Sequence, residues 1–306
     1  MGRYFLRRVL QTIPLMLIIS IIVFLFIHII PGDPVRTLAG KDAEVEEIEA
    51  IREELGLNDN VFVQYFNYMG RLFKGDLGRS YKSGIPTAQL VGERMINTVK
   101  LVISAMIWAP VLGILFGVVS AVHRGKFADH LLMFIAILGL SAPGFWLGLM
   151  GIQAFSVQLG WLPVSGLNGW KGMILPSFVM GIGAMAELAR YSRSSMLDVM
   201  REDYVRTARS KGQKDSKVIF FHGFRNALIQ IVTILGLQIG ALLSGSVLTE
   251  TVFSIPGIGR LLVDSIAFRD YPVIQALLML FAFQYVVINL IVDVLYGVIN
   301  PKIRLE

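Results

Sequence analysis

The sequence predicts an all-α, polytopic membrane protein with six transmembrane helices. Of its 306 residues, 55% are hydrophobic and only 16% are charged, and the mean hydropathy is +0.65. Soluble domains carry about 25% charged residues. Several apolar runs reach the roughly 20 residues that a helix needs to cross a bilayer. The most basic internal segment, residues 190–226, separates two of these runs. The positive-inside rule places so basic a short loop in the cytoplasm.

The first apolar run, residues 9–30, follows Arg3, Arg7 and Arg8. It is longer than the apolar region of about 7–15 residues in a signal peptide, and no cleavage site of small residues follows it. We therefore expect a retained first helix whose N-terminus lies inside. This helix and its cytoplasmic tip together cover residues 1–30.

Residues 31–97 are more polar and predict a small extracytoplasmic helical region. The motif Pro31-Gly32-Asp33-Pro34 ends the first helix, because proline cannot continue a helix and Asp-Pro favours a turn. Beyond this turn, apolar side chains recur every three or four residues, which indicates an amphipathic helix. They are Val45, Ile48, Ile51 and Leu55.

Five further spans complete the core transmembrane domain, residues 98–306. We expect them at about residues 98–122, 131–159, 173–188, 229–248 and 276–299. The third span is interrupted by S-A-P-G at 141–144, which predicts either a broken helix at a transport site or a structural kink. Small residues at four-residue spacing predict close helix contacts. They are Gly113 and Gly117 in the second span, and Gly236, Gly240 and Ser244 in the fifth. Six spans place both termini in the cytoplasm.

Several classes of chemistry are excluded by what the sequence lacks. It contains no cysteine and no G-x-x-x-x-G-K-[ST] motif, which excludes thiolate chemistry, cysteine metal sites and P-loop ATP hydrolysis by this chain. The four histidines lack metal-ligand spacing. The net charge of +6 falls in termini and loops that we place in the cytoplasm, which argues against a nucleic-acid partner. We expect a transport subunit that is not an enzyme and holds no cofactor or metal of its own.

The basic segment, residues 190–226, is patterned rather than uniformly charged. A helix is predicted from Asp203 to Lys211, closed by Gly212, because glycine tolerates the left-handed conformation at a helix C-terminus. The apolar residues of a second amphipathic stretch are Val218, Phe220, Phe221 and Phe224. Two short helices with a glycine between them predict a rigid cytoplasmic protrusion. A solvated basic loop held near anionic lipid headgroups is the alternative.

The string D-Y-V-R-T-A-R-S-K-G, followed by H-G-F-R-N-A-L, resembles the cytoplasmic coupling loop of bacterial ABC importer permeases in the peptide, nickel and glutathione group. The superfamily pattern has Glu-Ala-Ala, three residues and Gly. Here Arg206 replaces the glutamate and Phe224-Arg225 replaces the later Leu-Pro, as in the peptide-permease variant. The resemblance implies that ten residues couple the chain to an ATPase. They are Asp203, Tyr204, Arg206, Thr207, Ala208, Arg209, Lys211, Gly212, Arg225 and Asn226.

Four further motifs extend the resemblance over nearly the whole chain. They are G-D-L-G-x-S at 75–80, L-T-E-T-V-F-S-x-P-G-x-G-R at 248–260, R-D-Y-P at 269–272 and V-D-x-L-Y-G-x-x-N-P at 292–301. The resemblance implies a type I ABC importer permease fold in the bacterial cytoplasmic (inner) membrane. The implied partners are a second permease subunit, two ATPase subunits that bind ATP and Mg, and an extracytoplasmic substrate-binding protein. Closure of the ATPase dimer would drive alternating access.

The cargo is indicated less sharply than the family. Di- and oligopeptides are our first expectation. Glutathione is the second, because the chain length, the G-W-L-P turn and the ending resemble that branch, and nickel chelates are the third. A proton-coupled secondary peptide transporter belongs to a different class, and the small number of charges inside the spans disfavours it. A membrane scaffold without transport is a further alternative.

Polar residues inside apolar spans are candidates for a translocation path, because such residues are costly in a membrane. Those we expect on the path are Glu187, Arg190, Gln238 and Asn289, and Asp293 is a further charge inside a span. A local pair of Glu187 with Arg190 or Tyr191 is the structural alternative. Hydrogen bonds between helices are the alternative for Gln238 and Asn289.

Overall fold

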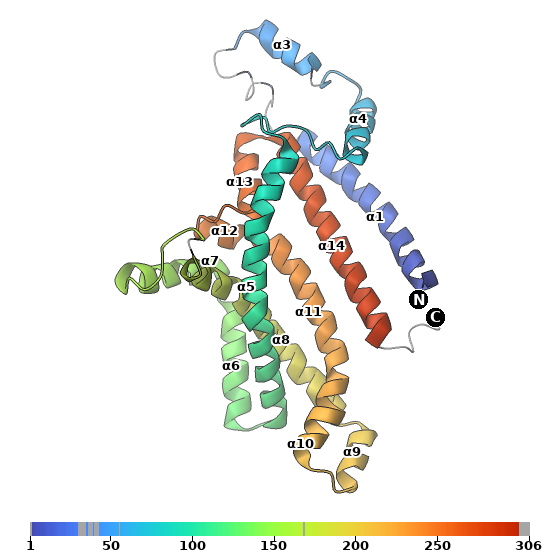
Figure 1. The fold of residues 1–306 in the computed structure, drawn as a ribbon, viewed down its shortest axis with the longest axis vertical. Helices are drawn as coiled ribbons and strands as arrows, with labels where there is room; N and C mark the ends of the chain where they lie inside the picture. The colour runs from blue at the N-terminus through green and yellow to red at the C-terminus, as the bar shows by residue number, and fades with distance from the viewer. Residues whose placement is uncertain are drawn as a thin grey trace.

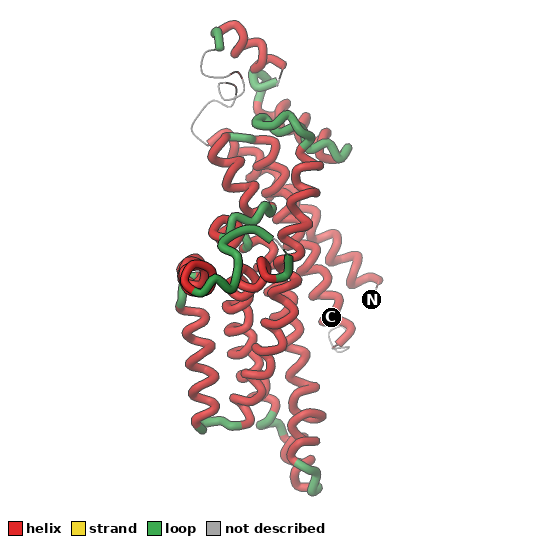
Figure 2. Tube along the Cα trace, turned by 60° about the vertical axis from the view of Figure 1, so that its left-hand side comes forward, coloured by secondary structure: helices red, strands yellow, loops and turns green. Residues whose placement is uncertain are grey.

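The chain folds as an elongated bundle of helices. A computed structural model describes residues 2–29, 35, 39, 43–54, 56–167 and 169–299. Apart from an isolated bridge between Arg79 and Pro86, the described residues contain no strand. Helices follow one another along almost the whole trace, and most run along the long axis of the molecule (Figures 1 and 2).

The helices differ widely in length. In chain order they are α1 (Gly2–Ile29), α3 (Val45–Glu54), α4 (Val61–Phe73), α5 (Thr87–Val122), α6 (Phe127–Ser141), α7 (Gly144–Gly151), the π-helix η1 (Ile152–Gln158), α8 (Lys171–Val199), α9 (Asp203–Ser210), α10 (Asp215–Lys217), the π-helix η2 (Val218–Phe224), α11 (Arg225–Gly245), α12 (Val247–Val252), α13 (Ile258–Phe268) and α14 (Tyr271–Ile299). The expected turn at 31–34 and the C-terminal residues 300–306 lie outside the described residues.

If each bent pair of helices is counted as one span, the described residues contain the six predicted spans by length and composition. Four single helices are long and apolar enough to cross a membrane: Arg7–Phe26 in α1, all of α5, all of α8, and Tyr271–Val294 in α14. Two bent pairs supply the others. They are Phe127–Ser141 with Gly144–Gln158, bent by 97°, and Asp215–Leu228 with Gln230–Leu243, bent by 46°.

The third span is not one helix crossing the bilayer in a line. Ala142 is extended, with φ −78° and ψ 126°, because the proline that follows disfavours helical geometry at the preceding residue. After this break α7 turns across the long axis (Figure 1). There Gly148 packs against α12, and a Cβ at Gly148 would lie 3.1 Å from Val252 Cγ1. The predicted interruption at 141–144 is confirmed, and α7 uses it to reach α12.

Three helices extend beyond the predicted spans. The helix of the second span begins at Thr87, ahead of the expected start near residue 98, and that of the sixth begins at Tyr271, ahead of residue 276. The helix of the fourth span continues to Val199, so residues 190–199 are helix and not the start of a loop. The charges of Arg190 and Arg193 placed the predicted loop there. Ser192 and Ser195 are buried, and the Ser195 hydroxyl donates to Gln230 Oε1 of α11 at 2.6 Å.

Glycines bring the central helices into close contact, as their spacing predicts. A Cβ on Gly113 of α5 would lie 2.6 Å from the Met185 carbonyl oxygen of α8. Gly117 is packed as tightly against Ser192. On α11, Gly236 and Gly240 face α14. The close contacts predicted for these glycines are confirmed, whereas the side chain of Ser244 is not among those described.

A buried carboxylate, that of Glu250, joins α5, α12 and α13. Its Oε1 accepts hydrogen bonds from the hydroxyls of Thr98 at 2.6 Å and Ser246 at 2.8 Å. Its Oε2 accepts from the backbone N–H of Arg260 at 2.9 Å, in the first turn of α13. The positive end of that helix dipole favours a carboxylate there. The chain thereby closes the segment 250–260 onto α5.

A second buried carboxylate joins two motifs that lie far apart in the sequence. Asp270 accepts hydrogen bonds from the Ser80 hydroxyl at 2.5 Å and the Tyr81 N–H at 2.9 Å. These contacts fix the G-D-L-G-x-S segment at 75–80 against the R-D-Y-P segment at 269–272. Both motifs therefore serve one packed corner, at the end of the molecule opposite α9 (Figure 1).

Candidate coupling site

Helix α9 begins and ends where the sequence predicts. Glu202 is extended, with φ −65° and ψ 146°, and Asp203 puts a negative charge in the first turn, where the helix dipole favours it. After Ser210 the chain turns at Gly212, whose φ of +72° is left-handed. Its N–H donates to the Arg209 carbonyl at 2.9 Å. A residue with a Cβ is strained in this conformation, so the predicted role of Gly212 is confirmed.

The buried apolar face of α9 holds this helix in place. Val205 and Ala208 of α9 are buried against Val218 of η2. Val199 and Met200, at the end of α8, pack against the same cluster. Burying a valine side chain stabilises by about 1.5–3 kcal/mol, so α9 is a fixed element rather than a loose loop.

The expected second short helix is not separate from the fifth span. Helices α10, η2 and α11 follow one another without a break from Asp215 to Gly245. The protrusion is therefore α9 lying against the extended start of α11, with Gly212 in the turn between them. Figure 1 shows this part at one end of the molecule.

Nine of the ten residues that we expected to contact an ATPase are exposed. They are Asp203, Tyr204, Arg206, Thr207, Arg209, Lys211, Gly212, Arg225 and Asn226. The tenth, Ala208, is buried, so it supports the surface and does not belong to it. The local ion pairs are loose, at 3.7 Å for Arg206 with Asp203 and 3.8 Å for Arg209 with Asp215. Such exposed pairs contribute little stability.

The structure brings both parts of the motif together. Tyr204 on α9 lies beside Asn226 on α11, and partial desolvation at this junction raises the pKa of the Tyr204 phenol. Asn226 donates to the His222 carbonyl at 2.8 Å, and His222 Nε2 lies 3.0 Å from Gln213 Oε1. We call the nine exposed residues, together with this junction, the coupling surface.

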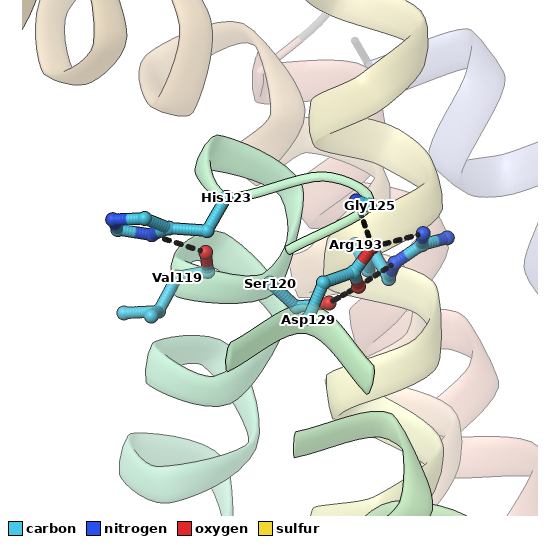
Figure 3. A network of polar contacts seen from close by, with 6 residues as sticks. All are labelled: Val119, Ser120, His123, Gly125, Asp129 and Arg193. Carbon is cyan, nitrogen blue, oxygen red and sulfur yellow. Dashed lines mark hydrogen bonds and ion pairs between the residues drawn. The ribbon is translucent and has the colours of Figure 1, made fainter. Parts of the chain in front are cut away.

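A partly buried ion pair joins α6 to α8 (Figure 3). Arg193 of α8 grips Asp129 of α6 with two hydrogen bonds, Nε to Oδ1 at 2.7 Å and Nη2 to Oδ2 at 2.9 Å. The Gly125 N–H donates to Oδ2 at 2.9 Å, and the Ser120 hydroxyl donates to Oδ1. Bidentate pairs of this kind are geometrically specific.

This ion pair fastens the α5–α6 turn to α8, six residues before α8 ends at Val199. Sequence reasoning treated Arg193 as one of many positive charges and did not single out Asp129. A signal was present in the sequence: Asp129 is an acid three residues after the basic turn H-R-G-K at 123–126. It also lies in the first turn of a helix, where acids are favourable.

The residues expected on the translocation path lie in two separate parts of the structure. The Gln238 amide of α11 donates to the Glu187 carboxylate of α8, so Glu187 is bonded between helices rather than to Arg190 or Tyr191 as the local alternative required. Arg190 is exposed. Asn289 instead lines a cavity of about 190 Å³ between α1 and α14.

The same cavity is lined by a second ion pair between membrane helices. Arg8 Nη1 of α1 lies 3.1 Å from Asp293 Oδ2 of α14. Charges inside membrane helices usually pair in this way because an unpaired charge is costly there. In the described part of the chain, no three His, Asp or Glu side chains are grouped so that they could hold a metal ion.

Comparison with known proteins identifies the family. The model described as "Binding-protein-dependent transport system inner membrane component" matches residues 113–305, and the model of the corresponding N-terminal part matches residues 1–111. The chain belongs to this family of ABC importer permeases. It is a membrane-spanning transport subunit, and the family description places its members in the inner membrane.

Relatives of this permease match over its whole length. It is 48% identical to "Glutathione transport system permease protein GsiC" of Escherichia coli O6:H1, over 99% of both chains. The proteins of the same name in Escherichia coli K12 and Shigella dysenteriae serotype 1 are 47% identical over the same shares.

Solved structures show that the permease has the predicted type I ABC importer fold. An inward-facing form of the MetNI methionine ABC transporter matches with a TM-score of 0.59 and 18% identity, over 70% of this chain and 98% of that one. An amino acid ABC transporter with histidines matches with a TM-score of 0.52 and 18% identity, over 70% and 94%.

Proposed function

We propose that this chain is a permease subunit of an ATP-driven importer of glutathione. The observation that supports this cargo is the 48% identity to a glutathione permease over 99% of both chains. This second expectation from the sequence now takes precedence over di- and oligopeptides. Glutathione is itself a tripeptide, so the two cargo classes share amide and carboxylate groups.

The coupling surface is proposed to receive the movement of two ATPase subunits that bind ATP and Mg. Its residues are exposed at one end of the molecule, and a buried apolar cluster holds α9 rigidly beneath them. The ion pair of Asp129 with Arg193 fastens α8 to α5 and α6, so that a push on α9 moves three helices together. A second permease subunit and a substrate-binding protein complete the proposed complex.

We further propose the orientation and part of the path. The coupling surface and both termini face the cytoplasm, because the basic residues around them favour that side. The bonded pair of Glu187 and Gln238 lies on the path between α8 and α11, with Arg190 one turn further along α8. Asn289, which lines the α1–α14 cavity, is not included.

The test is a reconstituted complex of all partner subunits in proteoliposomes. Arg206→Glu reverses one exposed charge on α9, which follows the C-terminal end of α8. Lys171→Glu also reverses a positive charge, but at the N-terminal end of α8, far from α9. We expect Arg206→Glu to abolish the ATP hydrolysis stimulated by the loaded binding protein, while the complex still assembles. Lys171→Glu should leave the stimulated ATP hydrolysis intact. Undiminished stimulation in Arg206→Glu would refute the coupling role.

The cargo is tested in the same proteoliposomes with wild-type protein. We expect ATP-dependent uptake of labelled glutathione. Unlabelled dipeptide or nickel should inhibit this uptake only weakly. Uptake of dipeptide without glutathione would overturn the proposed cargo and leave the coupling role standing. Ala208→Glu is unsuitable for the coupling test, because Ala208 is buried and a charge there would disturb the fold.

A further inference from the structure

Helix α4 carries a stripe of exposed aromatic side chains. Phe62, Phe66 and Phe73 are 75%, 71% and 81% exposed. At 100° per residue, their spacing of four and seven places all three on one face of the helix. Isolated exposed apolar residues are common, but a contiguous apolar stripe marks an interaction surface.

A different face of α4 attaches it to α1. The hydroxyls of Tyr65 and Ser20 are hydrogen-bonded at 2.9 Å. The Phe24 ring lies 5.4 Å from the Tyr65 ring and 6.0 Å from the Tyr68 ring, between centroids. Tyr68 is buried in this cluster. The aromatic stripe is therefore free of the contacts that hold α4.

These contacts set the depth of α4 in the membrane. Ser20 and Phe24 belong to the stretch Arg7–Phe26 that is apolar enough to cross the bilayer. Phe24 lies two residues from the end of that stretch, so side chains of α4 reach the last turns of the span. Figure 1 shows α4 beside the end of α1. A helix at this level lies where hydrocarbon meets headgroups.

The surroundings of the stripe have the pattern of an interfacial helix. On α1 the apolar side chains of Leu25 and Phe26, at the end of the same span, are exposed. Arg71 and Lys74 are exposed on other faces of α4, about 80° or more away from the phenylalanines by helical geometry. Apolar aromatics on one side and basic residues on the other are typical of helices that lie in a membrane surface.

We propose that α4 is a membrane-surface anchor, with Phe62, Phe66 and Phe73 inserted among the lipid chains of the leaflet on the side opposite α9. Arg71 and Lys74 then meet the phosphates of the headgroups. The inference is independent of the cargo and of the coupling surface. It assigns lipid, rather than a protein partner, to this face because the contacts of α4 with Ser20 and Phe24 hold the face at the level where the α1 span ends.

The absence of cysteine from the chain makes a direct test practical. Phe66→Cys places a single thiol on the stripe, and its neighbour Asn67→Cys places one on the polar side. Each is labelled with an environment-sensitive fluorophore in the complete complex, whose other subunits have had their accessible cysteines replaced, in lipid nanodiscs. Quenching is then compared between lipids with a nitroxide on the acyl chain and a water-soluble nitroxide.

We expect the probe at Phe66 to be quenched several-fold more by the lipid nitroxide than the probe at Asn67, and the aqueous quencher to show the reverse order. Phe73→Cys and Lys74→Cys repeat the comparison in case one variant assembles poorly. Equal aqueous quenching at both positions of each pair would overturn the proposal. Protection of the stripe from both quenchers would also overturn it, because a protein would then cover this face.

Discussion

The α9 end of this permease and the packed region around α12 and α13 are built in opposite ways. At the α9 end, charged and polar residues are exposed on a short helix that three apolar side chains hold in place. In the packed region, which lies away from α9 (Figure 1), the carboxylates of Glu250 and Asp270 are buried and accept hydrogen bonds from residues 152 and 190 positions away in the sequence. The first arrangement leaves polar groups available to another protein. The second uses them to hold the chain together.

The largest effect on stability should come from removing the buried carboxylate of the packed region around α12 and α13. Glu250→Ala removes the acceptor of hydrogen bonds from Thr98, Ser246 and Arg260. Each hydrogen bond to a charged group contributes about 1.5–3 kcal/mol, and buried donors without partners add a cost. We expect destabilisation of at least about 3 kcal/mol, seen as a lower melting temperature of the purified complex.

The control for this change is Glu46→Ala on α3, which removes an exposed carboxylate. It should shift stability by less than about 0.5 kcal/mol. If Glu250→Ala melted like the control, the buried carboxylate would not be what joins α5 to α13.

A smaller effect is expected at the ion pair that joins α6 to α8. Asp129→Asn keeps the shape of the side chain but removes the charge that Arg193 grips. We expect a loss of about 1–3 kcal/mol, and a similar loss for Arg193→Lys, since lysine cannot make a bidentate contact. The double variant should lose less than the sum, because both changes break one interaction.

Thermal unfolding of the two single variants and the double variant measures this coupling energy. Lys126→Ala, at an exposed position of the same turn, is the matched control and should change little. Strictly additive losses would mean that Asp129 and Arg193 act separately.

At the α9 end a backbone effect should be the largest. Gly212→Ala forces a Cβ into a left-handed conformation, with φ +72°, which costs about 1–2 kcal/mol. Gly183→Ala is the control, since no atom lies within 4 Å of its added Cβ; by helix propensity it should stabilise by about 0.5–1 kcal/mol. Hydrogen exchange of residues 203–212 would report the difference locally. Equal protection in both variants would contradict the role of Gly212.

Sequence reasoning found the α9 end because its signals are local. The helix-compatible series from Asp203 to Lys211 and the closing Gly212 lie within ten residues. Helix periodicity and capping can be read over such distances. The burial of Ala208 was not predicted, because it depends on contact with Val218 across the turn.

The hydrogen bonds of the packed region around α12 and α13 could not be predicted in this way. Glu250 stands in a polar motif, and nothing near it in the sequence indicates that Thr98 supplies a hydrogen bond from α5. Asp129 was missed for the same reason, since its partner Arg193 is 64 positions away. The end of α8 was placed too early because the charges of Arg190 and Arg193 suggested a loop, whereas Ser192 and Ser195 beside them are buried between helices. Pairing between distant helices decides these cases.

The smallest effect on stability should come from Arg206→Ala. Its guanidinium makes only a loose, exposed pair with Asp203, at 3.7 Å, and such pairs contribute about 0–1 kcal/mol. We expect the melting temperature of the complex to stay within error of wild type while stimulated ATP hydrolysis falls several-fold. That combination separates an interface residue from a structural one, because variants at buried residues such as Glu250 should lower the melting temperature and the stimulated ATP hydrolysis together. A melting temperature that fell as far as in Asp129→Asn would mean that Arg206 supports the fold, and the contrast between the two regions would then fail at one of its exposed residues.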